Sequence, residues 1–171
     1  SRVHQKNGFE TVSRRPSPHD RTVRCVQALS LMRRVGVEDD ARAELDALTD
    51  ILDLSVRDVE YAIARMKQRG LVRKAGRFRR VTPKILAIAL ATETVEAHAS
   101  SLPALIRSLP TPQAREAVAD RLADLSGQDE VKRFCRWALG PEGLFADVDT
   151  LRDDFTVFRR LATAAPEVAL R

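Results

Sequence analysis

The fold is decided by residues 45–83, which read LDALTDILDLSVRDVEYAIARMKQRGLVRKAGRFRRVTP. The first part of this stretch predicts a helix, because four apolar residues recur at helical spacing: Leu45, Leu48, Ile51 and Leu52. After a short turn, Ser55 opens another helix with Asp58 three residues on, which is the capping-box pattern. Gly70 ends that helix. Leu71-Val72 and residues 78–81 then predict two short strands.

The residues before this stretch predict one more helix. Ser17 is suited to cap it, Pro18 fits its first position, and Asp20 lies where a capping-box acid would. Gly36 is a natural stop for it. Three helices, with a tight turn between the second and third, followed by a β-hairpin are typical of a winged helix-turn-helix. We therefore predict a winged-helix domain over residues 17–83.

A fourth helix is expected to begin at Thr82-Pro83. Its first half is apolar on every side and contains Ile85, Leu86, Ile88 and Leu90. A helix that is apolar all round is typically buried all round, and this run is too short to cross a bilayer. The pattern predicts a buried inter-domain connector between the winged helix and the residues that follow.

All later segments favour helix, and the fold class is therefore mainly α. Apolar residues at helical spacing predict helices over 102–109, 114–125, 131–139 and 151–161, and Pro166 opens a last one. Paired short helices suggest the start of a helical, repeat-like domain over residues 84–171, and its abrupt end suggests truncation at the C-terminus. Residues 1–16 are interpreted as a linker or arm.

Composition narrows the function classes. The chain has 171 residues, with 29 Lys and Arg against 24 Asp and Glu, for a net charge of +5. No run of 18 apolar residues exists, and no secretory signal is visible, so neither a membrane nor export is expected. Cys25 and Cys135 lie far apart without metal-ligand spacing, and we interpret them as core thiols in a reducing cytoplasm.

Charge is distributed unevenly along the chain. Residues 38–58 carry eight acids and two bases, whereas residues 65–84 carry nine bases and no acid. The second group includes the candidate wing: Arg73, Lys74, Arg77, Arg79 and Arg80. These cations could follow a nucleic-acid backbone. Alternatively they could face acids on another domain or on the second helix. An acidic second helix would repel phosphate, which disfavours DNA.

The third helix offers a candidate recognition face. Its outward residues are expected to be Arg57, Tyr61, Arg65 and Gln68. Arginine can read guanine and glutamine can read adenine, but such residues are also ordinary on a helix surface. Asp58 and Glu60 flank this face and would oppose phosphate.

The sequence contains no catalytic constellation that we can assign. It has neither GxxxxGK[ST] nor GxGxxG. Its three histidines, His4, His19 and His98, are far apart and lack partners at metal-ligand spacing. The expectation is a non-enzymatic chain without a metal or cofactor of its own.

Several stretches together carry a resemblance to a known family. They are Leu45-Asp46-Ala47-Leu48, Ser55-Val56-Arg57-Asp58-Val59, Arg69-Gly70-Leu71-Val72, Gly76-Arg77-Phe78-Arg79-Arg80-Val81-Thr82-Pro83 and Leu86-Ala87-Ile88-Ala89-Leu90-Ala91. In this order they resemble the winged-helix segment of bacterial STAND-type (NACHT/NB-ARC-like) ATPases. The tail, with Phe158-Arg159-Arg160-Leu161-Ala162 and Ala165-Pro166-Glu167, is similar to the first helical sensor repeats of such proteins. The resemblance covers roughly residues 20 to 171.

The resemblance implies a regulatory segment that couples domains in signalling or defence. In that family the winged helix packs on a nucleotide-binding domain and moves when sensor repeats bind a ligand, after which the ATPase oligomerises. Partners would be other domains of the same protein, and ATP or ADP with Mg would belong to the parent protein. The Walker motifs are not in this chain, so hydrolysis is not assigned to it. The alternative is a winged-helix DNA-binding transcriptional regulator with a helical sensing or dimerisation tail.

Overall fold

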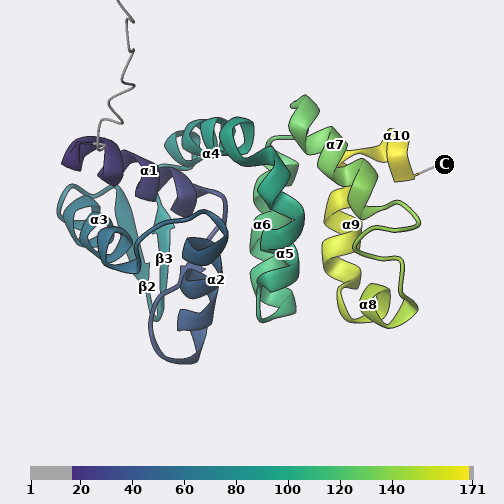
Figure 1. Ribbon diagram of the computed structural model, residues 1–171, viewed down its shortest axis with the longest axis horizontal. Helices are drawn as coiled ribbons and strands as arrows, with labels where there is room; N and C mark the ends of the chain where they lie inside the picture. Colours follow the sequence, from purple (N-terminus) through teal and green to yellow (C-terminus); the bar gives the residue numbers. More distant parts are fainter. Residues whose placement is uncertain (1–16, 170–171) are drawn as a thin grey trace, which may run out of the picture.

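The computed structural model describes residues 17–169, and the expected arm over residues 1–16 lies outside them. The described chain is mainly helical with one small antiparallel sheet (Figure 1). Its buried apolar residues form one continuous cluster that runs from Cys25 in the first helix to Ala165 near the end. No helix within this part of the chain has the length and hydropathy needed to span a membrane.

The first half of the structure, called the N-terminal unit below, covers residues 18–81. Its elements are α1 (Pro18–Ser30), β1 (Val35–Gly36), the 3₁₀ turn η1 (Asp39–Arg42), α2 (Ala43–Ile51), α3 (Val56–Gln68), β2 (Val72–Ala75) and β3 (Phe78–Val81). The sheet has the strand order β1-β3-β2. Helices α1 and α3 are in close contact with each other, and α2 packs against α3 and β1.

The predicted caps are largely present. The Ser17 hydroxyl accepts a hydrogen bond from the Asp20 backbone N–H at 3.1 Å, and the Asp20 carboxylate accepts one from the Ser17 backbone N–H, which completes the capping box. Ser55 accepts from the Asp58 N–H at 3.4 Å. Gly70 follows α3 with φ +73°, a conformation that glycine adopts without a steric cost.

The first helix ends earlier than the sequence suggested. It stops at Ser30, and the predicted stop at Gly36 is wrong, because Val35 and Gly36 form β1 and pair with β3. Gly36 is needed there for a close approach, since a Cβ atom at this position would lie 2.3 Å from the Ala41 carbonyl oxygen. A two-residue strand cannot be predicted from the sequence, because so short an element has no periodicity to detect.

The second half contains the remaining helices. They are α4 (Lys84–His98), the 3₁₀ turn η2 (Ala99–Ser101), α5 (Leu102–Ser108), α6 (Pro112–Asp124), α7 (Asp129–Ala138), α8 (Val148–Asp153), α9 (Phe155–Ala164) and α10 (Pro166–Ala169). In Figure 1, α4 runs along the top, between the N-terminal unit and the pair of helices α5 and α6. Helices α7 to α10 lie to the right of that pair. Among these helices, α6 and α9 make the most extensive contact.

The helix expected over 151–161 is broken in two at Asp154. This residue is 3% exposed, and its carboxylate accepts two hydrogen bonds from the Arg115 guanidinium, at 2.6 and 2.9 Å. The pair ties the break between α8 and α9 to α6. Helical spacing alone does not reveal such a break, since the spacing predicted one continuous helix, yet Phe155, directly after the break, is 59% exposed.

The fourth helix is not buried on every side, and that part of the prediction is wrong. Its buried stripe consists of Ala87, Ala91, Thr94 and Val95. Ile85 is 79% exposed, and three other large connector residues are half-buried: Leu86, Ile88 and Leu90. The buried stripe thus includes two small alanines, while Leu86 and Leu90 line a cavity that α1 and α3 also line. Pro83 rather than Thr82 is the N-cap residue.

The connector does contact both halves of the structure. It packs mainly against α1 and also touches β3, α6 and α7. The expected position between the N-terminal unit and the later helices is therefore found, although the helix is covered on one face only.

A buried arginine joins the N-terminal unit to α6. Arg121 is 4% exposed, and its Nε donates to the carbonyl oxygen of Ser30, the last residue of α1, at 2.9 Å. Beside it, the Arg33 N–H donates to the Ala117 carbonyl oxygen at 2.9 Å. A helix leaves its last carbonyls without intrahelical partners, so a cation from α6 both satisfies one of them and suits the helix dipole. We call the Arg121–Ser30 and Arg33–Ala117 contacts the joint.

Two aspartate substitutions on α4 distinguish its buried stripe from its exposed side. We expect Ala91→Asp to lower the unfolding free energy by more than about 3 kcal/mol, since it places an unpaired charge against α1. Ile85→Asp is the matched control and should change stability by less than about 0.5 kcal/mol. Chemical denaturation followed by circular dichroism measures both, and equal losses would mean that Ile85 is buried too.

The joint makes a second stability prediction. Arg121→Ala should cost about 2–3 kcal/mol, because it leaves the buried Ser30 carbonyl without its donor. Arg33→Ala keeps the backbone bond to Ala117 and removes only an ion pair of a side chain that is 71% exposed, so we expect a loss below about 1 kcal/mol. Thermal unfolding of both variants tests the difference. If Arg121→Ala loses as little stability as Arg33→Ala, the Arg121–Ser30 bond does not contribute as proposed.

Candidate functional site on the charged hairpin

The candidate wing is the hairpin formed by β2 and β3. A two-residue turn with Gly76 at φ +57° connects the strands. Lys74 lies opposite Arg79, and Arg73 lies opposite Arg80. Directly opposite residues of an antiparallel pair share a face, and neighbours along a strand alternate. The hairpin therefore presents its cations on two faces, one with Lys74 and Arg79 and the other with Arg73 and Arg80.

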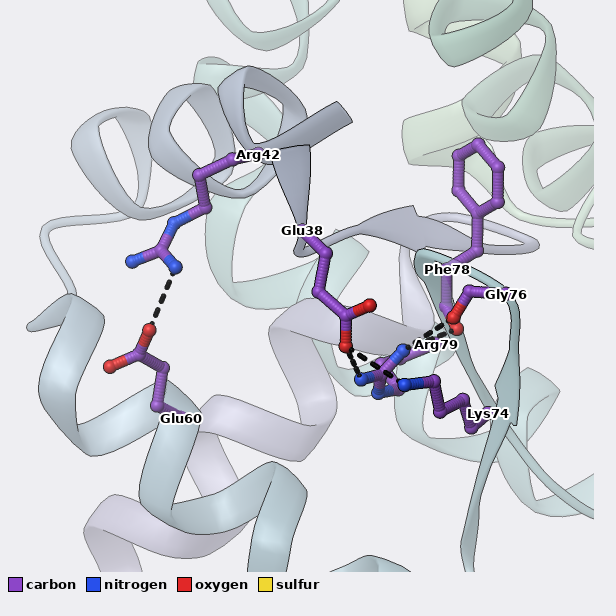
Figure 2. Close-up of polar contacts among 7 residues, drawn as sticks. All are labelled: Glu38, Arg42, Glu60, Lys74, Gly76, Phe78 and Arg79. Atoms are coloured by element: carbon purple, nitrogen blue, oxygen red, sulfur yellow. Dashed lines mark hydrogen bonds and ion pairs between the residues drawn. The ribbon is translucent and has the colours of Figure 1, made fainter. Parts of the chain in front are cut away.

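The first face is neutralised from within the chain. The Glu38 carboxylate accepts from Lys74 at 3.2 Å and from Arg79, as Figure 2 shows. The Arg79 side chain is only 10% exposed, and its guanidinium also donates to the carbonyl oxygens of Gly76 at 3.1 Å and Phe78 at 2.9 Å. Arg79 is thus held by three acceptors and is not free to follow a nucleic-acid backbone.

A second acid extends this neutralisation to the turn. Asp40 forms an ion pair with Arg77, and the Val37 N–H donates to the Arg77 carbonyl oxygen at 2.9 Å. Because β1 pairs with β3, residues 37–40, which directly follow β1, lie next to the cations of the hairpin. The partners are acids, as one interpretation of the sequence held. They precede α2, however, and do not lie on it or on another domain.

The second face has no such partner. Arg73 and Arg80 are exposed, and neither forms an ion pair with any residue of 17–169. Like charges directly opposite each other in a ladder are destabilising. The five wing residues therefore separate into three that are occupied by Glu38 and Asp40 and two that are available to an external anion.

The environment of Glu38 changes its ionisation. Hydrogen bonds, mainly from Arg79 and secondly from Lys74, lower the pKa of the Glu38 carboxyl below its ordinary value. Arginine and lysine side chains favour the charged form, and the carboxylate therefore stays ionised to lower pH in the folded state than in the unfolded one.

The four residues of the expected recognition face are not equivalent in the structure. Arg57, Tyr61 and Gln68 are exposed on α3, whereas Arg65 is half-buried and lines a small apolar cavity between α1, α3 and α4. On the flank, Glu60 pairs with Arg42 at 2.8 Å (Figure 2). The face that remains is a mixed polar surface with a neutralised acid at its edge.

Two residues that the sequence did not single out prove central to the geometry. Glu38 is one of the eight acids of residues 38–58, and Arg121 belongs to the predicted helix over 114–125. The uneven charge of residues 38–58 and 65–84 was a usable signal for Glu38, because adjacent segments of opposite sign tend to pair. Arg121 lies in a segment of ordinary amphipathic spacing, and nothing in the sequence distinguishes it from a surface arginine.

The remaining chemistry-bearing groups are placed as core or surface residues. Cys25 and Cys135 are buried, as predicted, and burial raises the pKa of each thiol to about 11. Residues 17–169 hold no group of three or more His, Cys, Asp or Glu side chains arranged to bind a metal ion. His4 lies outside the described residues.

Comparison of the whole chain with protein-family models, with curated proteins and with solved structures finds no match. The assignment of a role therefore depends on the geometry of the chain itself.

The ion pairs of Glu38 predict a pH-dependent contribution to stability. Because its folded-state pKa is lowered, this contribution is full above the ordinary glutamate pKa of about 4.3 and is lost as pH falls through the folded-state value. Glu38→Gln should therefore unfold more easily than the wild type at pH 7, and the two should converge at acid pH. Thermal midpoints from pH 7 downward measure this. A gap between the two proteins that stays constant to acid pH would contradict the pairing.

Proposed function

We propose that this chain is a non-catalytic coupling segment of a larger STAND-type ATPase, in signalling or defence. In this proposal the N-terminal unit is a winged helix that docks on a nucleotide-binding domain, and the later helices are the start of a sensor array. The order of helices and the hairpin after α3, with β1 added to β3, are consistent with a winged helix.

The observation that carries the proposal is the joint. A relay needs two rigid bodies whose movements are coupled. Arg121 and the backbone of Arg33 link α6 directly to the end of α1, and α4 contacts both halves. A displacement of the N-terminal unit would therefore be transmitted to α6 and, through the Arg115–Asp154 pair, to α9.

The state of the hairpin favours docking over DNA binding. Lys74, Arg77 and Arg79 already pair with acids of the chain, so they would release few counterions on binding a phosphate backbone. The acids Glu38 and Asp40 beside them would oppose a polyanion. Charged groups of both signs suit an interface with another protein domain, where they set orientation.

A DNA-binding regulator is the second candidate, since Arg57, Tyr61 and Gln68 are exposed on one helix. The coding sequence upstream of residue 1 separates the two. We expect it to encode a P-loop of the pattern GxxxxGK[ST] in the same reading frame. A start codon immediately before residue 1, with no P-loop, would overturn the ATPase proposal.

A binding measurement tests the second candidate directly. We expect fluorescence anisotropy with random-sequence duplexes at physiological salt to give no affinity beyond the ~10⁻⁴–10⁻⁶ M typical of non-specific binding. The Arg57→Ala, Tyr61→Ala, Gln68→Ala triple variant, built from exposed positions, should behave like the wild type. Tighter binding that the triple variant loses would favour the DNA-binding regulator.

A further inference from the structure

Arg80, on the second face of the hairpin, lines a cavity that the docking role does not use. This cavity, of about 280 Å³, lies between the hairpin and α6. Its lining includes four cations from four separate segments: Arg33, Arg80, Lys84 and Arg121. Asp124 is the one carboxylate in the lining. We call this cavity the basic groove.

Two of the four cations are already engaged with Asp124. Lys84 contacts one carboxylate oxygen at 2.9 Å, and Arg121 contacts the other at 3.2 Å. The carboxylate thus holds both side chains in position but cancels only one of their charges. Arg33 pairs with Asp120, which lies outside the lining and also pairs with Arg160 at 2.9 Å.

Two donors of the groove have no partner in the described chain: the Arg80 guanidinium and the Nη2 atom of Arg121. Arg80 has no ion-pair partner among residues 17–169 and lies opposite the like-charged Arg73. Arg121 is 95% buried by its side chain, and its Nη2 makes no hydrogen bond to the described chain, although Nε and Nη1 each make one. Among the described residues the one fully buried side-chain atom without a partner is Gln128 Oε1, so Nη2 of Arg121 keeps access to solvent and could donate to an anion in the cavity.

We propose that the basic groove binds the phosphate group of a small phosphorylated molecule. The lining carries a net charge of +3, which suits a phosphate monoester of about −1.5 to −2 better than a carboxylate of −1. Guanidinium groups match phosphate oxygens with paired donors. The cavity is large enough for a phosphate with part of the group attached to it.

The walls favour a small ligand over a nucleic acid. An adjoining cavity of about 360 Å³ shares Arg33 and Arg80 with the basic groove and is also lined by Arg34, Arg79, Glu116 and Asp120. Two of its cations are already paired within the chain, Arg79 with Glu38 and Arg33 with Asp120. A second phosphate there would meet two carboxylates, whereas the basic groove has only Asp124 in its lining. The site does not depend on the docking role, because it uses neither Glu38 nor the cations that Glu38 and Asp40 hold.

The test uses inorganic phosphate as the probe, with chloride at matched ionic strength as the reference. Calorimetric titration of the wild type should show one site per chain. Arg80→Ala and Lys84→Ala should each weaken the affinity about tenfold, because each removes a charge-assisted hydrogen bond. Lys67→Ala, an exposed cation on α3 away from the groove, is the matched control and should bind like the wild type.

Thermal unfolding separates a binding role from a structural one. Without phosphate, Arg80→Ala should be at least as stable as the wild type, since it relieves the repulsion with Arg73. With phosphate, the wild type and Lys67→Ala should gain in midpoint, and Arg80→Ala should gain much less. Equal gains in all three proteins would mean general stabilisation by phosphate and would overturn the site.

A DNA duplex, added in place of phosphate, identifies the source of the phosphate group. We expect phosphate-containing small probes such as pyrophosphate to bind at least as tightly as inorganic phosphate, and the duplex to bind no better in the wild type than in Arg80→Ala. Duplex binding that is tighter than pyrophosphate binding and is lost in Arg80→Ala would assign the groove to nucleic acid and overturn the proposal of a small ligand.

Discussion

The buried Arg121 guanidinium is the interaction on which the arrangement of the two halves depends. It is 4% exposed, and burial lowers its pKa from the ordinary arginine value. Removing a charge from water is costly unless it gains hydrogen bonds in return. The Asp124 carboxylate lies on the same helix and provides one of these bonds wherever α6 is placed. The Ser30 carbonyl provides the other only when α6 lies against the end of α1. The charge therefore specifies one placement of α6, which apolar packing alone would leave less sharply defined.

The same logic explains the opposite charges of adjacent segments. Six net negative charges over residues 38–58 and nine positive charges over residues 65–84 left two interpretations open: cations that follow a nucleic-acid backbone, or cations that face acids on the second helix or another domain. In the structure, pairing of β1 with β3 places Glu38 and Asp40 beside the hairpin, and the two charge groups partly cancel. Charge counted along a sequence overstates the charge available to a partner, because the fold decides which charges meet.

The sequence predicted the helices and their caps well, and predicted tertiary contacts poorly. The Ser17 and Ser55 caps and the glycine turns are local features, and local spacing reveals them. Three features were not predicted because each depends on a distant residue. The strand at Val35–Gly36 forms by pairing with β3, and the helix break at Asp154 is held by Arg115. The burial of the charged Arg121 depends on its hydrogen bond to Ser30. For the candidate site, residue types were identified, but their division into paired and unpaired faces required the register of the hairpin.

The connector shows how a correct observation led to a wrong conclusion. Residues 85–91 are apolar on all sides, but only one side of this helix packs against the rest of the chain, and only the side chains on that side are buried. Ala87 and Ala91 are fully buried in a helix whose most extensive contact is with α1. Ile85 is then left 79% exposed, and Leu86 and Leu90 line a small apolar cavity with Val23 and Met66.

The joint and the basic groove lie side by side, and this has a consequence for coupling. Arg33 and Arg121 belong to both, and Lys84 begins α4. An anion held by Arg80 on the hairpin and by Arg121 on α6 would add a bridge across the same boundary that the Arg121–Ser30 bond already spans. A ligand that binds only when both sides are in place stabilises that arrangement by its own binding free energy. Occupancy of the groove would then strengthen the mechanical link between the N-terminal unit and the later helices, without any movement of the hairpin.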